Sequence, residues 1–183
     1  MIRILSLLSI ALVTLSGWSQ PAEAKKLKMW ATGVAVSSAA ADLDGNGEPG
    51  FHSTLQGSGT IGPVWIDNVG DLASDFSIIC EFDPDTSAPV GVELQYVGFS
   101  TVIRTIGGDQ IYIENNASAP GTLCYNFVHN TSTFEVLGDI VGGTGRFEGA
   151  SGWIRMSGGG RSLAAIDPFD AKITGELELP PRH

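Results

Sequence analysis

Apolar and polar residues alternate along several short segments, and this period of two residues constrains the fold more than any other feature of the chain. In residues 173–179, the alternation separates apolar Ile173, Leu177 and Leu179 from polar Thr174, Glu176 and Glu178. Residues 134–140 place Phe134, Val136 and Ile140 on one face in the same way. A period of two is typical of a strand with one buried face, and no segment sustains the 3.6-residue period of a helix. The pattern predicts an all-β protein.

Turn-forming residues divide the chain into short segments of this kind. Strands are expected at residues 27–36, 54–61, 76–82, 90–106, 110–114, 122–128, 134–140, 152–156 and 173–179. The 24 glycines are about twice the usual share of ~7% and fit a small barrel whose strands bend sharply. Residues 37–41 are too few for a stable helix. Short connections without a crossover helix predict a single antiparallel β-barrel domain of about eight strands, with no long helix.

The charge balance excludes one class of partner. The chain has 20 acidic and 10 basic residues, giving a formal net charge of −10. A nucleic-acid-binding face needs clustered basic residues, so nucleic acid is not an expected partner. The hydrophobic share of 43% is too high for a disordered acidic tail. An acidic globular domain is the class that remains.

The first 24 residues have the pattern of a secretory signal peptide. A basic start at Arg3 precedes an uncharged, largely apolar run over residues 4–17, and the small-residue site Ala22-Glu23-Ala24 follows Pro21. The apolar run is shorter than the ~20 residues that span a bilayer, which argues against a membrane anchor. We expect cleavage after Ala24, a single domain over residues 25–183 without a membrane span, and a secreted or periplasmic location.

Export changes the interpretation of the two cysteines. Cys80 and Cys124 form an even pair in a chain bound for an oxidising compartment, where disulfides persist. We expect a structural disulfide, which would stabilise the fold by roughly 4 kcal/mol through chain entropy. Two buried free thiols are the alternative.

Residues 42–48 fit the first half of a calcium-binding loop, with short oxygen-bearing side chains at alternate positions. A weak calcium site would use the side chains of Asp42, Asp44 and Asn46, with Glu48 adding a carbonyl or carboxylate. Ser53 stands where an EF-hand has its bidentate Glu, and no helices flank the segment. The favoured interpretation is therefore an Asx-rich surface turn.

No catalytic set emerges from the sequence. His52, His129 and His183 are scattered without metal-ligand spacing, and no G-x-S-x-G motif occurs. Whether the protein is an enzyme stays open, with a non-catalytic role favoured. Of the four Trp, three lie beyond the signal region: Trp30, Trp65 and Trp153. They either line a cavity suited to an apolar or aromatic ligand or, as is more common, fill the core.

Residues 142–152, GGTGRFEGASG, resemble the signature of the allene oxide cyclase and dirigent barrel superfamily. More closely, the chain resembles a group of uncharacterised secreted bacterial proteins with this domain, which share the turn at 42–47, a mid-chain cysteine (Cys80) and a G-x-L-C segment (121–124). The resemblance implies a barrel of about eight strands enclosing an apolar cavity. The matched residues belong to the fold signature: Gly142, Gly143, Thr144, Gly145, Phe147, Gly149 and Gly152.

The resemblance also implies activity without a cofactor. Our expected function is a non-catalytic barrel that binds a small apolar ligand, and the alternative is a cofactor-free isomerase or cyclase. The expected first strand, residues 27–34, lacks the Glu and Asn that the cyclases use. A calcium-dependent adhesion module is a third, weaker hypothesis. Related barrels are often dimers or trimers, so a homo-oligomer stays open.

Overall fold

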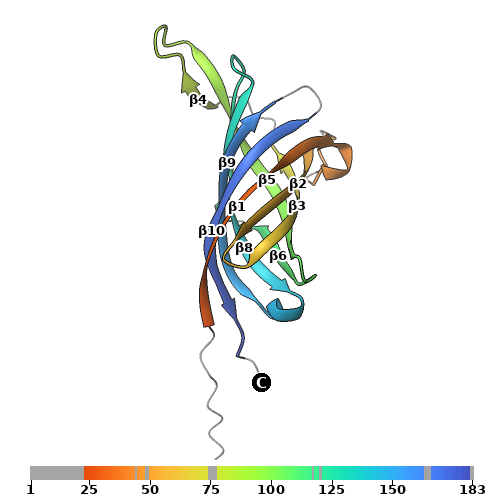
Figure 1. The fold of residues 1–183 in the computed structure, drawn as a ribbon. Coiled ribbons are helices and arrows are strands. Elements are labelled where there is room, and N and C mark those ends of the chain that lie inside the picture. The colour runs from red at the N-terminus through yellow and green to blue at the C-terminus, as the bar shows by residue number, and fades with distance from the viewer. Residues whose placement is uncertain are drawn as a thin grey trace, which may run out of the picture.

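The computed structural model describes residues 23–43, 45–47, 50–73, 78–116, 118–119, 121–162 and 166–181. Within these ranges, ten strands form one antiparallel sheet (Figure 1). The strands are β1 (Glu23–Ser38), β2 (Gly50–Gly59), β3 (Gly62–Leu72), β4 (Ile78–Phe82), β5 (Pro89–Thr105), β6 (Gln110–Asn115), β7 (Thr122–Asn126), β8 (Thr131–Gly143), β9 (Ser151–Arg161) and β10 (Asp167–Leu179). Two single-turn 3-10 helices, η1 (Ala39–Ala41) and η2 (Gly145–Phe147), complete the described elements.

Eight of the strands close into a barrel. Hydrogen bonding runs in the order β3-β2-β1-β10-β9-β8-β6-β5, and β5 pairs back onto β3 from Val64↔Thr105 to Leu72↔Tyr96. The two remaining strands lie beside the long β5. β7 bridges β5 and β8 beyond the end of β6, and β4 forms a hairpin with the start of β5 that projects from the barrel (Figure 1). The predicted all-β antiparallel barrel of about eight strands is confirmed.

The alternation of side chains fills most of the barrel interior. Apolar residues from every strand of the closed ring point inward, and the fully buried ones include Met29, Leu55, Ile66, Ile103, Ile111, Ile154, Ile173 and Leu177. On β10 the buried residues Ile173, Leu177 and Leu179 alternate with Thr174, Glu176 and Glu178, as predicted. Burial of such aliphatic side chains is the main stabilising contribution to the fold, at about 1.5–3 kcal/mol each.

Strand β3 was missed by the sequence prediction. Its inward positions run Val64, Ile66, Asn68 and Gly70, and all four are buried. The second half of the strand therefore carries an amide and a glycine where the pattern requires apolar residues. Since these positions line a polar part of the interior, hydrophobic alternation did not reveal the strand.

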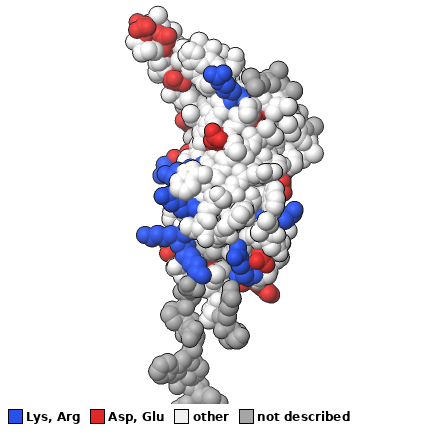
Figure 2. Space-filling view, in the orientation of Figure 1, with Lys and Arg blue, Asp and Glu red and all other residues white. Residues whose placement is uncertain are grey.

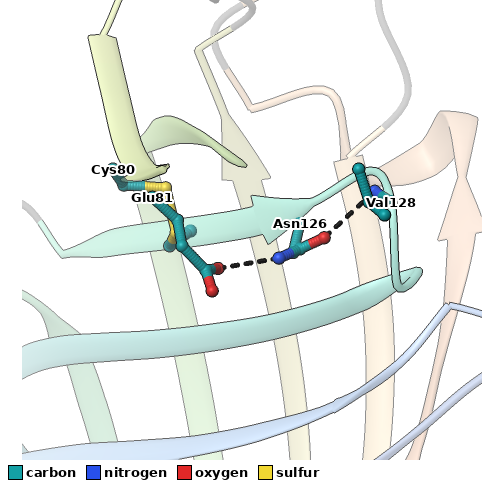
Figure 3. Close-up of a disulfide and its surroundings, with 5 residues drawn as sticks. Cys80, Glu81, Asn126 and Val128 are labelled. Atoms are coloured by element: carbon teal, nitrogen blue, oxygen red, sulfur yellow. Dashed lines mark hydrogen bonds between the residues drawn. A yellow bond between two sulfur atoms is a disulfide. The ribbon is translucent and has the colours of Figure 1, made fainter. Parts of the chain in front are cut away.

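The expected disulfide is present and ties the projecting hairpin to the barrel. Cys80 of β4 bonds to Cys124 of β7, with their Cα atoms 5.9 Å apart (Figure 3). The bond passes over Gly91 of β5, where an added Cβ would lie 3.2 Å from Cys80 Sγ and 3.4 Å from Cys124 Sγ. Beside it, Asn126 Nδ2 donates a hydrogen bond to Glu81 Oε2 at 2.9 Å (Figure 3).

The predicted signal peptide falls almost wholly outside the described residues, since residues 1–22 are not among them. Glu23 and Ala24 begin β1, opposite Leu179 and Glu178 of β10. Cleavage after Ala24 stays a prediction. No helix in the described part of the chain is long and apolar enough to cross a membrane.

Candidate functional site

A recess hollows one end of the barrel. It lies where β1 and β3 end and β2 and β10 begin, and its volume is about 150 Å³. Eight strands contribute its lining, which consists of Ala35, Phe51, Ser53, Asn68, Leu72, Tyr96, Leu123, Ser132, Phe134, Met156, Asp167 and Phe169. We call this cavity the end recess.

Aromatic rings form much of the wall of the end recess. Phe51 and Tyr96 meet edge to face with ring centroids 5.8 Å apart, and Phe134 and Phe169 do so at 5.6 Å. Phe51 takes its place because the facing residue on β3 is Gly70, where a Cβ would lie 2.3 Å from the Phe51 ring. Edge-to-face pairs hold rings in defined positions, which gives the recess fixed apolar walls.

A buried polar chain crosses the same space. Thr101 Oγ1 donates a hydrogen bond to Asn68 Oδ1 at 2.7 Å, and Asn68 Nδ2 donates to Ser53 Oγ at 3.3 Å. The three residues are 1–4% exposed, so water does not compensate them. Because a buried amide without partners is costly, this chain fixes the Asn68 amide at the edge of the recess.

Tyr96 adds a hydroxyl group to the apolar wall. The residue is 6% exposed, and no hydrogen bond from the described residues reaches its hydroxyl. Burial alone raises the pKa of the Tyr96 phenol well above its usual value near 10, so the group is neutral over the physiological range. A neutral hydroxyl in a lined cavity is available to donate a hydrogen bond to a bound molecule.

The size of the end recess decides which ligands it suits. A dry cavity of ~150 Å³ holds a benzene-sized molecule, whereas drug-sized ligands occupy ~300–1,000 Å³. At about 150 Å³ the recess matches a single ring with one small polar substituent. A fused multi-ring compound or a long acyl chain would require the walls to move.

The fold-signature residues lie at the opposite end of the barrel. They form the end of β8, η2 and the start of β9, where Phe147 is buried with 2% exposure. Four of these glycines have a positive φ, among them Gly145 at +58° and Gly152 at +126°, where an added Cβ would lie only 2.0 Å from the Glu176 carbonyl oxygen. Arg146 donates to the Ile61 carbonyl oxygen at 2.9 Å and lies 3.3 Å from an Asp109 oxygen.

The remaining signature residues also help to close this end of the barrel. Thr144 Oγ1 accepts a hydrogen bond from the Gln110 backbone N–H at 3.1 Å. Gly142, Gly143 and Gly149 complete the turn, and an added Cβ at Gly143 would lie 2.4 Å from the Gln110 carbonyl oxygen. In this arrangement the signature segment closes the barrel end remote from the end recess.

The proposed calcium loop is only partly described, because Asp44 and Glu48 lie outside the described residues. The Asp42 carboxylate accepts hydrogen bonds from the backbone N–H groups of Gly45, Asn46 and Gly47 at 2.7–3.1 Å. This is the geometry of an Asx-rich turn. No group of three or more His, Cys, Asp or Glu in the described part of the chain is placed to hold a metal. Calcium binding stays a prediction.

The three tryptophans beyond the signal region neither line the interior cavity nor fill the core, so both interpretations were wrong. Trp30, Trp65 and Trp153 lie on the outer wall and are 53%, 39% and 47% exposed. The alternation along β1 indicates the outward position of Trp30. Leu27, Met29 and Ala31 form the inward set of this strand, and Trp30 falls between Met29 and Ala31. His52 of β2 and His129, in the turn between β7 and β8, are both exposed, and His183 lies outside the described residues.

Sequence reasoning identified little of the end recess. Phe134 was placed on a buried face, but Phe51, Asn68, Tyr96 and Phe169 were not singled out. These residues come from β2, β3, β5 and β10 and meet only after the barrel closes with its strand stagger. The one available signal was the pair of small and polar residues, Asn68 and Gly70, in an otherwise β-rich segment.

Fold and recess together define an antiparallel eight-stranded barrel with one closed end and one hollow, aromatic end. No protein-family profile and no curated protein matches the chain. Solved structures similar to it include the pterocarpan synthase dirigent protein GePTS1, at 14% identity over 96% of this chain and 98% of that chain, with a TM-score of 0.32. The pterocarpan synthase dirigent protein PsPTS1 is 13% identical over 89% and 99%, also with a TM-score of 0.32. These scores are low, and the assignment of the barrel rests on the strand pairing.

Proposed function

We propose that the protein is an exported, non-catalytic barrel that binds a small single-ring ligand in the end recess. One observation carries the proposal: a cavity of about 150 Å³ with aromatic walls has Tyr96 and Asn68 among its lining residues. Apolar walls with few polar groups are the usual composition of a small-molecule site. The predicted signal peptide and the Cys80–Cys124 disulfide support export.

Binding is favoured over ring closure by the residues that face the interior. The inward side chains of β1 include Leu27, Met29 and Ala31, and none of them carries a proton-transferring group. Asn68 is held by Thr101 and Ser53, so its role is to position a ligand by hydrogen bonding. Ring closure stays the alternative, because a cyclase needs a carboxylate or similar group close to the reacting atoms and Asp167 is part of the lining of the end recess.

Calorimetric titration with benzyl alcohol, toluene and naphthalene tests the proposal. Benzyl alcohol is expected to bind more tightly than toluene by roughly 2- to 10-fold, since its oxygen can accept a hydrogen bond from Tyr96. Naphthalene is expected to bind more weakly than either, because two fused rings exceed the recess. Tyr96→Phe keeps the ring and is expected to remove the preference for benzyl alcohol.

A pair of neighbouring substitutions provides the steric control. Ala35→Phe adds a ring to the lining of the end recess and is expected to abolish binding. Val34→Phe places the same ring on the outer wall, where Val34 is 43% exposed, and is expected to leave binding unchanged. Equal binding by the two variants, or no binding of any probe by a folded wild-type protein, would overturn the proposal.

A further inference from the structure

A shallow groove crosses the outer wall of the barrel, remote from the interior. It has a volume of about 550 Å³ and runs over β2, β1, β10 and β9. Its sides include Trp30 and Thr32 of β1, Gln56 of β2, and Asp170 and Lys172 of β10. The wall is hollow there because neighbouring positions carry small residues: Ser58, Ser157 and Gly159. We call it the outer groove.

Trp30 is the one aromatic residue among the described residues that line the outer groove. The residue is 53% exposed, and the Lys28 ammonium lies 4.9 Å from its ring centroid. Thr32, two residues along the same face of β1, lines the groove on the other side of Trp30. A fixed indole ring beside hydrogen-bonding side chains can stack on the apolar face of a sugar ring while its hydroxyls are bound at the edges.

Two lysines flank Trp30 at the outer groove, although the protein is acidic overall: Lys28 contacts its ring and Lys172 is paired with it. All four lysines of the chain, Lys25, Lys26, Lys28 and Lys172, lie on the paired strands β1 and β10. Figure 2 shows several Lys and Arg side chains on the lower half of the barrel beside Asp and Glu, a further basic side chain higher up, and Asp and Glu at the tip of the projecting hairpin. Lys28 and Lys172 form no ion pair within the described part of the chain. Their positive charge is therefore available to an anion.

The cationic side chains and the hydroxyl-binding side chains lie at different positions along the paired strands of the outer groove. Lys172 is paired with Trp30, and Asp170 is paired with Thr32, which in turn is paired with Gln56. Cations thus lie at the Lys28 and Lys172 end of the outer groove, and hydroxyl-binding groups lie at the Asp170 and Gln56 end. A ligand that suits this order has a carboxylate at one side of a sugar ring and hydroxyls at the other.

We propose that the outer groove binds an anionic polysaccharide whose rings carry carboxylates. A uronate ring stacks on Trp30, its carboxylate contacts Lys28 and Lys172, and its hydroxyls contact Asp170, Gln56 and Thr32. The same observations disfavour an anionic lipid surface. A planar bilayer does not enter a hollow.

Calorimetric titration with a hexamer of galacturonate, and with the same hexamer reduced to the neutral alcohol, tests this assignment. The uronate hexamer is expected to bind several-fold more tightly than the neutral hexamer, and its affinity is expected to fall between 0.05 and 0.5 M salt because the lysines are exposed. Lys172→Gln is expected to lower the affinity and to weaken its dependence on salt.

A matched pair of tryptophan variants tests the stacking contact. Trp30→Ala is expected to weaken uronate binding by at least about tenfold. Trp153→Ala removes a tryptophan of similar exposure (47%) outside the outer groove and is expected to change binding by less than about twofold. Unchanged thermal unfolding and near-ultraviolet circular dichroism show that each variant folds.

Several outcomes would overturn the proposal. One is the absence of binding at millimolar uronate hexamer, and another is equal affinity for the neutral hexamer. Equal losses in Trp30→Ala and Trp153→Ala would also contradict it. Binding to phosphatidylglycerol vesicles without binding to the hexamer would assign the face to a membrane instead. Saturation of the end recess with benzyl alcohol provides an independent check and is expected to leave hexamer binding unchanged.

Discussion

The ring and the hydroxyl of Tyr96 affect the stability of the fold in opposite directions. Its ring packs edge to face against Phe51 and Phe99, which fixes its position, and the residue that carries the hydroxyl is 6% exposed and lines the end recess. The packing stabilises the barrel end, whereas an unpartnered buried hydroxyl costs free energy. A residue that retains such a group inside a cavity is well suited to bind a ligand there.

The raised pKa of Tyr96 makes stability depend on alkaline pH. Because the phenol ionises less readily in the folded state, its contribution to folding is complete below about pH 10 and is lost as the pH rises further. Between pH 9 and 11, the free energy of unfolding is expected to fall more for the wild type than for Tyr96→Phe. Urea unfolding at each pH measures the difference. Parallel pH profiles for the two proteins would show that the phenol is not buried as described.

Gly91 is required for a different reason, which is space for the disulfide. An added Cβ would lie 2.9 Å from Glu81 Cβ and in close contact with both sulfurs, so Gly91→Ala is expected to lower the free energy of unfolding by about 1–3 kcal/mol. Gly107→Ala is the control, since the nearest atom to its Cβ would be Thr105 Oγ1 at 3.8 Å. Urea unfolding compares the two, and equal stability would contradict the close approach at Gly91.

At the scale of single elements, the sequence predicts a strand well where its buried face is apolar. β10 and β8 follow their alternation, and the half-buried pattern of β10 was predicted residue by residue. β3 was missed because Asn68 and Gly70 occupy its inward face. The segment expected to continue to residue 128 ends as β7 at Asn126, whose side-chain oxygen accepts hydrogen bonds from the N–H groups of Val128 and His129 and turns the chain.

The hairpin of β4 and β5 depends on its disulfide more than the barrel does. The double variant Cys80→Ala/Cys124→Ala is expected to lose up to about 4 kcal/mol of stability, through the loop entropy of the unfolded chain. Hydrogen exchange is expected to accelerate most in β4, because β5 is the only described strand that pairs with it. The paired strands β1 and β10 serve as the internal reference. A larger acceleration of exchange in β1 and β10 than in β4 would contradict the stronger dependence of the hairpin on the disulfide.

The whole molecule has two unlike ends. One is closed by Phe147 and the glycine-rich turn, and the other opens into the end recess. The barrel class was predictable because alternation and turns are local properties. The recess was not predictable, because its residues come from eight strands and their convergence depends on closure between β3 and β5. The groove on the outer wall was missed for a similar reason, since Trp30 and Lys172 are neighbours only across the β1–β10 pair.

Closure by Phe147 is expected to contribute strongly to stability. Phe147→Ala removes a ring with 2% exposure, and the loss of burial together with the cavity left behind is expected to cost about 3–5 kcal/mol. Phe127→Ala removes a ring that is 48% exposed and is expected to change stability by less than about 0.5 kcal/mol. Chemical denaturation measures both, and a small effect of Phe147→Ala would contradict its role as the end closure.

The end recess is expected to bind a single-ring ligand, whereas the interior around Met29 is filled by side chains. Methyl NMR of protein labelled at the methionine ε-carbon tests it directly, because Met156 lines the end recess and Met29 packs in the filled interior against Gly59. Titration with benzyl alcohol is expected to shift the Met156 methyl signal in a saturable manner and to leave the Met29 signal in place. A Met156 signal that stays unmoved at saturating benzyl alcohol would contradict the account.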